Sequence, residues 1–225
     1  MMKLLCLLVF MLVNTCPSAN YFRAGSLHRV VVDLNKVNVT VCVAADGGES
    51  FSAMCAREKP LAAITGNFYD PETLQLVGEL VIDGKIVDVS CDHVGPALVI
   101  FKDGQARIVS HDEYGKINKR TLHLGMQAGP RLVCHGKIAV DLTGFHIAPS
   151  ATRTAIGLTA DHKLIMIAVN SSISFTRLAS VMLASGCVDA LTLDGGSSTG
   201  LYVNDKVLVH PARIMVSILA AFPKT

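Results

Sequence analysis

Tryptophan is absent from this sequence of 225 residues, and aromatic residues make up only 5% of it. Broad carbohydrate-binding surfaces depend on several aromatic rings, each apolar on its face and polar at its edge. The composition therefore argues against such a stacked-ring surface. It favours a compact pocket that recognises its ligand through hydrogen bonds.

Charge is scarce as well. Charged residues make up 17% of the chain, the formal net charge is +2, and lysine and arginine form no run. Proteins that bind nucleic acids concentrate positive charge along one face, so we expect no nucleic-acid partner. Hydrophobic residues make up 51% of the chain, which is enough to fill a sizeable core and excludes a disordered protein.

The N-terminus has the pattern of a secretory leader. Lys3 supplies a positive charge, Leu4–Val13 is apolar but too short to cross a bilayer, and Pro17-Ser18-Ala19 offers small residues for cleavage. The alternative is a buried N-terminal strand or helix. We expect a signal peptide over residues 1–19 and a single domain over residues 20–225. The protein would then be secreted, periplasmic or in the cell envelope, with no stable membrane span.

The sequence has seven cysteines. The predicted leader contains Cys6 and Cys16, and the remaining five are Cys42, Cys55, Cys91, Cys134 and Cys187. No Cys-x-x-Cys pair occurs, and no cysteine lies near a histidine at zinc-binding spacing. We expect most of the five to be small hydrophobic core residues. If the chain is exported, one or two disulfides are the alternative.

Short apolar or alternating segments predict strands through most of the chain. They are His28–Leu34, Val37–Val43, Leu80–Ile82, Ala97–Phe101, Ala106–Val109, Arg131–Cys134, Ala155–Leu158, Leu164–Val169, Ala190–Leu193, Gly200–Val203 and Arg213–Ala220. Turn residues at 83–85, 103–105, 135–137, 161–163 and 204–206 predict hairpins.

Two segments have helical periodicity, Glu49–Lys59 and Thr176–Ser185, and Ser174 is placed to cap the second. No linker or low-complexity run interrupts the chain. These features predict an α+β fold of mixed, mostly antiparallel β-sheets with many hairpins and two or three helices in a single domain.

The most informative segment runs from Ala190 to Gly200. An apolar strand ends at Asp194, and Gly195 and Gly196 then allow a ligand to approach the main chain. Three hydroxyl residues follow directly. Such a turn can hold an anion or a sugar while the carboxylate orients a hydroxyl, a cation or a proton. An ordinary Asp-Gly hairpin turn is the alternative.

Two other segments carry polar groups where strands begin or end. Asn67 and Asp70 bracket two aromatic residues after an apolar strand, although an Asx turn with both rings in the core would give the same pattern. Arg153 lies between two threonines before another strand. A guanidinium matches the geometry of a phosphate, but a lone arginine is also common at a solvated strand edge.

The order of these segments resembles the phosphodiester glycosidase family over roughly residues 61–222. The segments that carry the resemblance are Ile64-Thr65-Gly66-Asn67-Phe68-Tyr69-Asp70, Ala128-Gly129-Pro130-Arg131-Leu132-Val133 with Gly136-Lys137, Arg153-Thr154-Ala155-Ile156-Gly157, and Leu191-Thr192-Leu193-Asp194-Gly195-Gly196-Ser197-Ser198. The last two, with a helix between them, are the most specific.

The resemblance implies hydrolysis of a sugar-1-phosphodiester, such as a substrate that carries an N-acetylglucosamine-1-phosphodiester. That reaction needs a cation for the phosphate, polar groups for the sugar hydroxyls and a carboxylate near the anomeric carbon. The implied catalytic residues are Asp194, Arg153 for the phosphate, and Asp70 as a second carboxylate. The implied substrate-binding residues are Asn67, Thr154, Gly195, Gly196, Ser197, Ser198 and Arg213.

We expect no metal site and no cofactor. Asp70, Asp194 and backbone carbonyls could ligate Ca²⁺ or Mg²⁺, but no spacing in the sequence requires a cation. One alternative function is a non-catalytic module of the same fold that binds carbohydrate or glycosyl phosphate, because the turn after Asp194 has one glycine fewer than the family's. The other is a purely structural exported domain in which that segment is only a turn.

Overall fold

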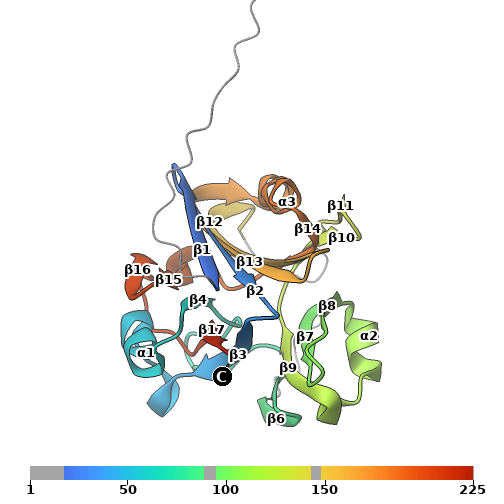
Figure 1. Cartoon of the computed structure of the whole chain (residues 1–225). Helices are drawn as coiled ribbons and strands as arrows, with labels where there is room; N and C mark the ends of the chain where they lie inside the picture. The colour runs from blue at the N-terminus through green and yellow to red at the C-terminus, as the bar shows by residue number, and fades with distance from the viewer. Residues whose placement is uncertain (1–17, 89–94, 143–147, 225) are drawn as a thin grey trace, which may run out of the picture.

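A computed structural model describes residues 18–88, 95–142 and 148–224, so residues 1–17 of the predicted leader lie outside the described residues. Strands dominate the fold and form three sheets in which the paired strands run antiparallel (Figure 1). In chain order they are β1 (Ala19–Ala24), β2 (Leu27–Asp33), β3 (Val37–Val43), β4 (Ala62–Thr65), β5 (Leu80–Ile82), β6 (Lys85–Asp88), β7 (Ala97–Phe101), β8 (Ala106–Val109), β9 (Leu122–Gln127), β10 (Arg131–Cys134), β11 (Lys137–Ile138), β12 (Ser150–Thr159), β13 (Lys163–Ser174), β14 (Cys187–Thr192), β15 (Leu201–Val203), β16 (Lys206–Val209) and β17 (Ser217–Pro223).

The three sheets differ in size. The largest has the strand order β1-β2-β13-β12-β14-β10-β11, and the two five-stranded sheets have the orders β16-β15-β4-β17-β3 and β6-β5-β9-β7-β8. The described residues also form three α-helices: α1 (Phe51–Glu58), α2 (His111–Lys116) and α3 (Phe175–Ala184). Short 3₁₀ turns occupy Ala45–Gly47, Lys119–Thr121 and Gly196–Ser198.

One hydrophobic core joins the sheets. Val30 from the large sheet, Ile64 from the second and Leu124 from the third all belong to the same buried cluster. The opposite face of each sheet packs against one helix, so α3 covers the large sheet, α1 the second and α2 the third (Figure 1). Every sheet therefore buries both faces over part of its area, and the molecule forms a single domain.

The mostly antiparallel fold predicted from the sequence is confirmed. All five predicted hairpin turns connect paired strands. Both predicted helices are present within two residues of their expected ends, and the Ser174 side chain caps α3 by accepting a hydrogen bond from the Arg177 N–H. Among the described residues no helix is both long enough and apolar enough to cross a membrane.

Some predictions of local structure were wrong or incomplete. The segment predicted as a strand from Arg213 enters β17 only at Ser217, because Met215 pairs with Glu49 outside the sheet and Arg213 turns toward Asp194. The sequence analysis also missed α2, whose six residues are too few to show a periodicity, and β1. Cys42, Cys55 and Cys187 are buried free thiols, as expected for core residues.

Candidate active site

Three segments far apart in the sequence meet where β14 ends. The N–H of Asp194 donates to the Gly66 carbonyl at 3.3 Å, and the N–H of Leu193 donates to the Thr154 carbonyl at 3.2 Å. Gly66 follows β4, while Thr154 lies within β12. The end of β14 therefore lies between the loop after β4 and the middle of β12.

The glycine turn is fitted closely against β12. A side chain at Gly195 would place its Cβ 3.0 Å from the Thr152 carbonyl oxygen and 3.4 Å from the Cα of Arg153. On either side of this contact, Thr154 Oγ1 donates to the Asp194 carbonyl at 2.5 Å and Thr152 Oγ1 donates to the Gly196 carbonyl at 2.8 Å. A Cβ at Gly195 would therefore require the backbone of β12 to move by a few tenths of an ångström, whereas glycine lets the two backbones approach without that shift.

The Asp194 carboxylate has a partner for each oxygen. Its Oδ1 accepts the Gly195 N–H at 2.9 Å, and its Oδ2 accepts Arg213 Nη2 at 3.0 Å. Arg213 Nε also donates to Ser198 Oγ at 2.6 Å. The Asp194 side chain is 11% exposed and that of Arg213 is 30% exposed, so the carboxylate lies below a guanidinium that solvent can reach.

Burial raises the pKa of the Asp194 carboxyl above its ordinary value. Ser198, the charge of Arg213 and the Gly195 N–H act in the opposite direction but do not cancel the effect of burial. The carboxylate is thus a stronger base than a carboxylate in water. Titratable groups with such shifts concentrate at functional sites.

The Arg213 guanidinium rests on an aromatic ring. Its Cζ lies 4.2 Å from the centre of the Tyr69 ring, within the range of a cation–π interaction. The Tyr69 hydroxyl donates to the Ile214 carbonyl at 2.5 Å, which anchors the residue after Arg213. From the sequence, Tyr69 was placed in the core only as an alternative and was given no role in the site. Its position between Asn67 and Asp70, in a segment that carries the family resemblance, was the signal that could have linked it to the site.

Asn67 is completely buried beside this cluster. Its N–H donates to Ser217 Oγ and its Nδ2 donates to the Gln127 carbonyl, each at 3.0 Å. Among the described residues, its Oδ1 has no hydrogen-bond partner. A buried acceptor without a partner is costly, so it is suited to receive a donor from a ligand.

Comparisons with known proteins identify the family of the chain. A family model described as phosphodiester glycosidase matches residues 58–219. The chain belongs to the phosphodiester glycosidase family. A search of curated proteins gave no match.

Solved structures with the same fold include the catalytic domain of one enzyme and a hypothetical protein. The catalytic domain of zebrafish N-acetylglucosamine-1-phosphodiester alpha-N-acetylglucosaminidase, auto-inhibited by its pro-peptide, has a TM-score of 0.75 at 19% identity, covering 96% of this chain and 82% of that one. A hypothetical protein from Synechocystis has a TM-score of 0.70 at 15% identity, covering 96% of this chain and 61% of that one.

A third similar structure, a protein assigned to export in Burkholderia pseudomallei K96243, has a TM-score of 0.63 at 14% identity. It covers 91% of this chain and 74% of that one. At these identities the three structures establish the fold alone.

Not every residue predicted for the site joins the cluster in this phosphodiester glycosidase. Arg153 is 5% exposed, and its guanidinium lies 3.9 Å from the centre of the Phe175 ring and donates to the Ala148 carbonyl. This places its side chain on the face of the large sheet that α3 covers, although its backbone touches Gly195. In the described part of the chain, no hydrogen bond or ion pair joins the Arg153 and Asp194 side chains.

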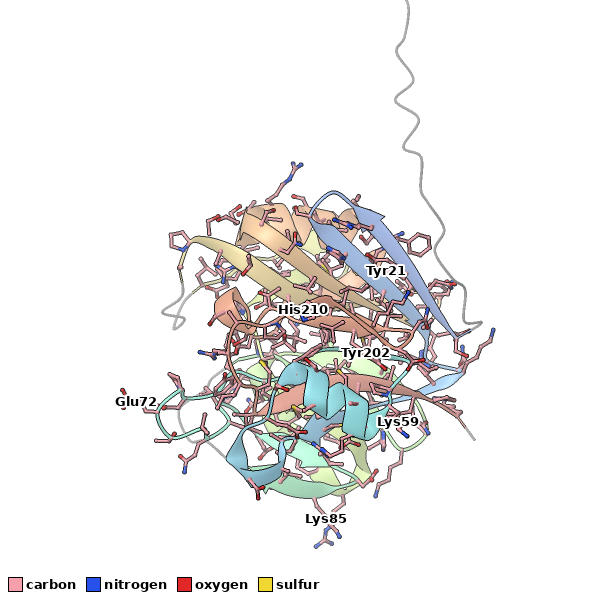
Figure 2. All side chains as sticks on the ribbon, turned by 90° about the vertical axis from the view of Figure 1, so that its left-hand side faces the viewer. Tyr21, Lys59, Glu72, Lys85, Tyr202 and His210 are labelled. Carbon is pink, nitrogen blue, oxygen red and sulfur yellow. The ribbon has the colours of Figure 1, made fainter. Side chains whose placement is uncertain are left out.

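Asp70 and Ser197 are both exposed. The Asp70 carboxylate accepts the N–H groups of Glu72 and Thr73 at 2.8 and 3.0 Å, which closes an Asx turn, and Glu72 extends outward at the edge of the molecule in Figure 2. That turn is the alternative that the sequence left open for Asp70. No group of three or more His, Cys, Asp or Glu side chains suited to a metal ion occurs within residues 18–88, 95–142 and 148–224.

Proposed function

We propose that this phosphodiester glycosidase hydrolyses the glycosidic bond of a sugar-1-phosphodiester. The observation that carries the proposal is the pairing of the buried Asp194 carboxylate with the half-exposed Arg213 guanidinium. A glycosyl phosphate presents an anomeric carbon and an anionic leaving group one bond apart. A carboxylate and a cation in direct contact match that arrangement.

Arg213 is the cation for the phosphate in this proposal. A guanidinium has five N–H donors, and bonds to Ser198 and Asp194 leave others directed elsewhere. The Tyr69 ring fixes the plane of the guanidinium, so the remaining donors have a defined direction. Arginine in a fixed plane binds phosphate oxygens in pairs.

Asp194 acts as the base. A water molecule attacks the anomeric carbon, its proton passes to the Asp194 carboxylate, and the bond between that carbon and the phosphate oxygen breaks. The electron pair of the broken bond leaves with the phosphate as a phosphomonoester, whose growing charge Arg213 stabilises. The raised pKa of Asp194 suits this role, because the carboxylate then holds the proton more firmly.

We assign the remaining polar groups, which are buried beside the Asp194 turn, to the sugar. Asn67 Oδ1 supplies an acceptor, and Ser198 and Thr154 supply hydroxyls beside the Gly195–Gly196 turn. Ser197 is exposed and is assigned to the rim of the site. Arg153 and Asp70 stay predictions from the sequence, and we propose Arg213 in the role first given to Arg153.

We also propose that the chain is exported and loses residues 1–19. The leader pattern and the exported protein of similar fold support this. Ala19 is completely buried and pairs with Val32, so cleavage after Ala19 would shorten β1 by one residue.

The test is the rate of hydrolysis of UDP-N-acetylglucosamine and of simpler N-acetylglucosamine-1-phosphodiesters by Asp194→Asn. We expect kcat to fall by about 10²- to 10⁴-fold, the usual contribution of a general base. Asp189→Asn is the matched control, because Asp189 lies on β14, the strand that leads to Asp194, and pairs with Arg131 at 2.6 Å instead of with a residue of the site.

Equal turnover by Asp194→Asn and Asp189→Asn would remove Asp194 from the chemistry. Binding of the glycosyl phosphate without any product from the unaltered protein would instead favour the non-catalytic binding module.

A further inference from the structure

A second concave surface lies between the β1–β2 hairpin and the end of α3. It consists of two cavities of about 740 and 270 Å³ that share Phe22, Arg29 and Ser185. We call this surface the hairpin groove. Its charged arm includes Asp33, Lys36, Asp161 and Lys163, and its apolar arm includes Ala24, Leu27, Val181 and Ala184. It shares no residue with the Asp194–Arg213 cluster.

Strand alternation explains why this surface exists. His28, Val30 and Val32 face the common core, so Leu27 and Arg29 face the opposite side of β2. α3 covers that side over β10, β12, β13 and β14 (Figure 1). In the described part of the chain, the face of the β1–β2 hairpin therefore continues past the end of the helix, and α3 covers it only partly, at Leu27 and Val31.

Arg29 is a cation without a compensating charge in the described residues. Lys36 pairs with Asp33 at 3.8 Å, and Lys163 pairs with Asp161 at 2.5 Å, so the two lysines of the groove are matched by two carboxylates. Arg29 has no ion pair, and its Nε is buried without a hydrogen-bond partner. Arg29 is therefore a partly buried positive charge that nothing in the described part of the groove balances. Arg23, on the wall of the second cavity, also has no ion pair there, but it is exposed and its Nε donates to the Gly25 carbonyl.

The surroundings of Arg29 make that charge costly. Its Cζ lies 4.6 Å from the centre of the Phe22 ring, and burial lowers its pKa. The nearby Cys187 thiol gives no compensation, because burial raises the pKa of that thiol to about 12 and keeps it neutral. A partly desolvated cation gains most from a bound anion, since charge-assisted hydrogen bonds are stronger where water is excluded.

We propose that the hairpin groove binds a single-chain anionic amphiphile, a long-chain carboxylate, with its headgroup on Arg29 and its hydrocarbon chain along the apolar arm. The fork of the guanidinium matches the two oxygens of a carboxylate. A monoanion balances the one partly buried cation without an ion pair, whereas a second negative charge would face Asp33 and Asp161. The apolar arm, which begins at the Phe22 ring, removes the chain from water.

The test is isothermal titration calorimetry of the purified protein with dodecanoate below its micelle concentration. Dodecanol and dodecyltrimethylammonium are the matched probes of equal chain length. We expect dodecanoate to bind more tightly than either. Arg29→Gln should weaken dodecanoate at least about tenfold, through loss of the charge-assisted hydrogen bonds, while leaving dodecanol unchanged.

Lys85→Gln is the control for net charge. In Figure 2, Lys85 lies at the opposite end of the molecule from Tyr21, a residue of β1. The Lys85→Gln substitution should therefore leave the dissociation constant for dodecanoate unchanged. Arg29→Lys keeps the charge and should give an intermediate affinity even if Arg29→Gln unfolds. Phe22→Ser should weaken dodecanoate and dodecanol alike.

Three results would overturn the proposal. One is equal affinity of Arg29→Gln and the unaltered protein for dodecanoate. The second is binding of the cationic probe as tight as that of the anionic one. The third is binding to phosphatidylglycerol vesicles with none to monomeric dodecanoate, which would make the groove a membrane contact.

Discussion

At the scale of single residues, the site depends on one ion pair and on the ring beneath it. Asp194 is held by a backbone N–H and a guanidinium, and that guanidinium is held by Ser198 and Tyr69. The geometry of Arg213, more than its charge, should therefore determine activity.

Arg213→Lys tests this geometry. Lysine keeps the charge but cannot donate to Ser198 and Asp194 in one plane. The loss of one charge-assisted hydrogen bond, about 1.5–3 kcal/mol, corresponds to a fall in kcat/KM of about 10- to 150-fold. Steady-state kinetics measures it, with Arg131→Lys as the control, since Arg131 makes a comparable pair with Asp189. Equal rates for the two variants would show that charge alone is enough.

The raised pKa of Asp194 predicts a pH dependence of stability. A carboxyl whose pKa is higher in the folded state binds more protons when the protein is folded. Its contribution to the free energy of unfolding is therefore complete below the pKa of the unfolded state and is lost as pH rises through the pKa of the folded state. Asp194→Asn lacks this dependence. The free energy of unfolding of Asp194→Asn, minus that of the unaltered protein, should therefore increase as pH rises from the unfolded-state pKa to the folded-state pKa of Asp194.

Urea unfolding of both proteins at a series of pH values from 4 to 8 measures the difference. A difference that stays constant, or that shrinks as pH rises, would mean that the environment of Asp194 does not favour the protonated form.

The sequence predicted the individual groups of the site better than their partners. The Asp194 turn and Asn67 were recognisable because glycine and polar residues follow apolar strands. The role of Arg213 in pairing with Asp194 was not, since the pair joins a strand end to a loop 19 residues later. For Arg153 the sequence predicted the position of the backbone but not that of the side chain. The Arg153 backbone lies against Gly195, while the Arg153 side chain points toward Phe175.

At the scale of secondary-structure elements, the site requires close contact between backbones. β4 ends at Thr65, and Gly66 then passes against Ser217, the first residue of β17. A Cβ at Gly66 would lie 2.9 Å from the carbonyl carbon and oxygen of Ser217, as well as against its hydroxyl. Backbone atoms cannot move aside as a flexible side chain can.

Gly66→Ala should therefore destabilise the protein by about 1–3 kcal/mol, the usual cost of overpacking. Gly115→Ala is the matched control, because a Cβ at Gly115 in α2 meets no atom within 4 Å. Alanine is the better helix former, so this control should raise stability by about 0.5–1 kcal/mol. Thermal unfolding followed by circular dichroism measures both, and equal melting temperatures would contradict the contact at Gly66.

The hairpins were the most predictable elements, because turn residues fix both the turn and the pairing beside it. The Asp83-Gly84 and Asp103-Gly104 turns each lie between paired strands. The assignment of strands to three sheets was beyond the sequence alone. For example, β12 pairs with β14 although β13 and α3 lie between them in the sequence, and no local pattern encodes that pairing.

At the scale of the whole molecule, three sheets around one core bring the ends of β4 and β14 and the middle of β12 together. That architecture is shared with structures of only 14–19% identity. Conservation of a fold at such low identity is consistent with a core that tolerates substitution while its pattern of buried positions is retained. Because the fold alone does not identify the reaction, the bond that is cleaved must be determined from the products.

The most direct measurement is hydrolysis of an N-acetylglucosamine-1-phosphodiester in water enriched in ¹⁸O, followed by mass spectrometry of the released phosphomonoester. Attack of water on the anomeric carbon leaves the phosphate oxygens unchanged, so we expect no ¹⁸O in the phosphomonoester. One ¹⁸O atom in that product would show cleavage between phosphorus and oxygen, and would contradict a glycosidase reaction at Asp194.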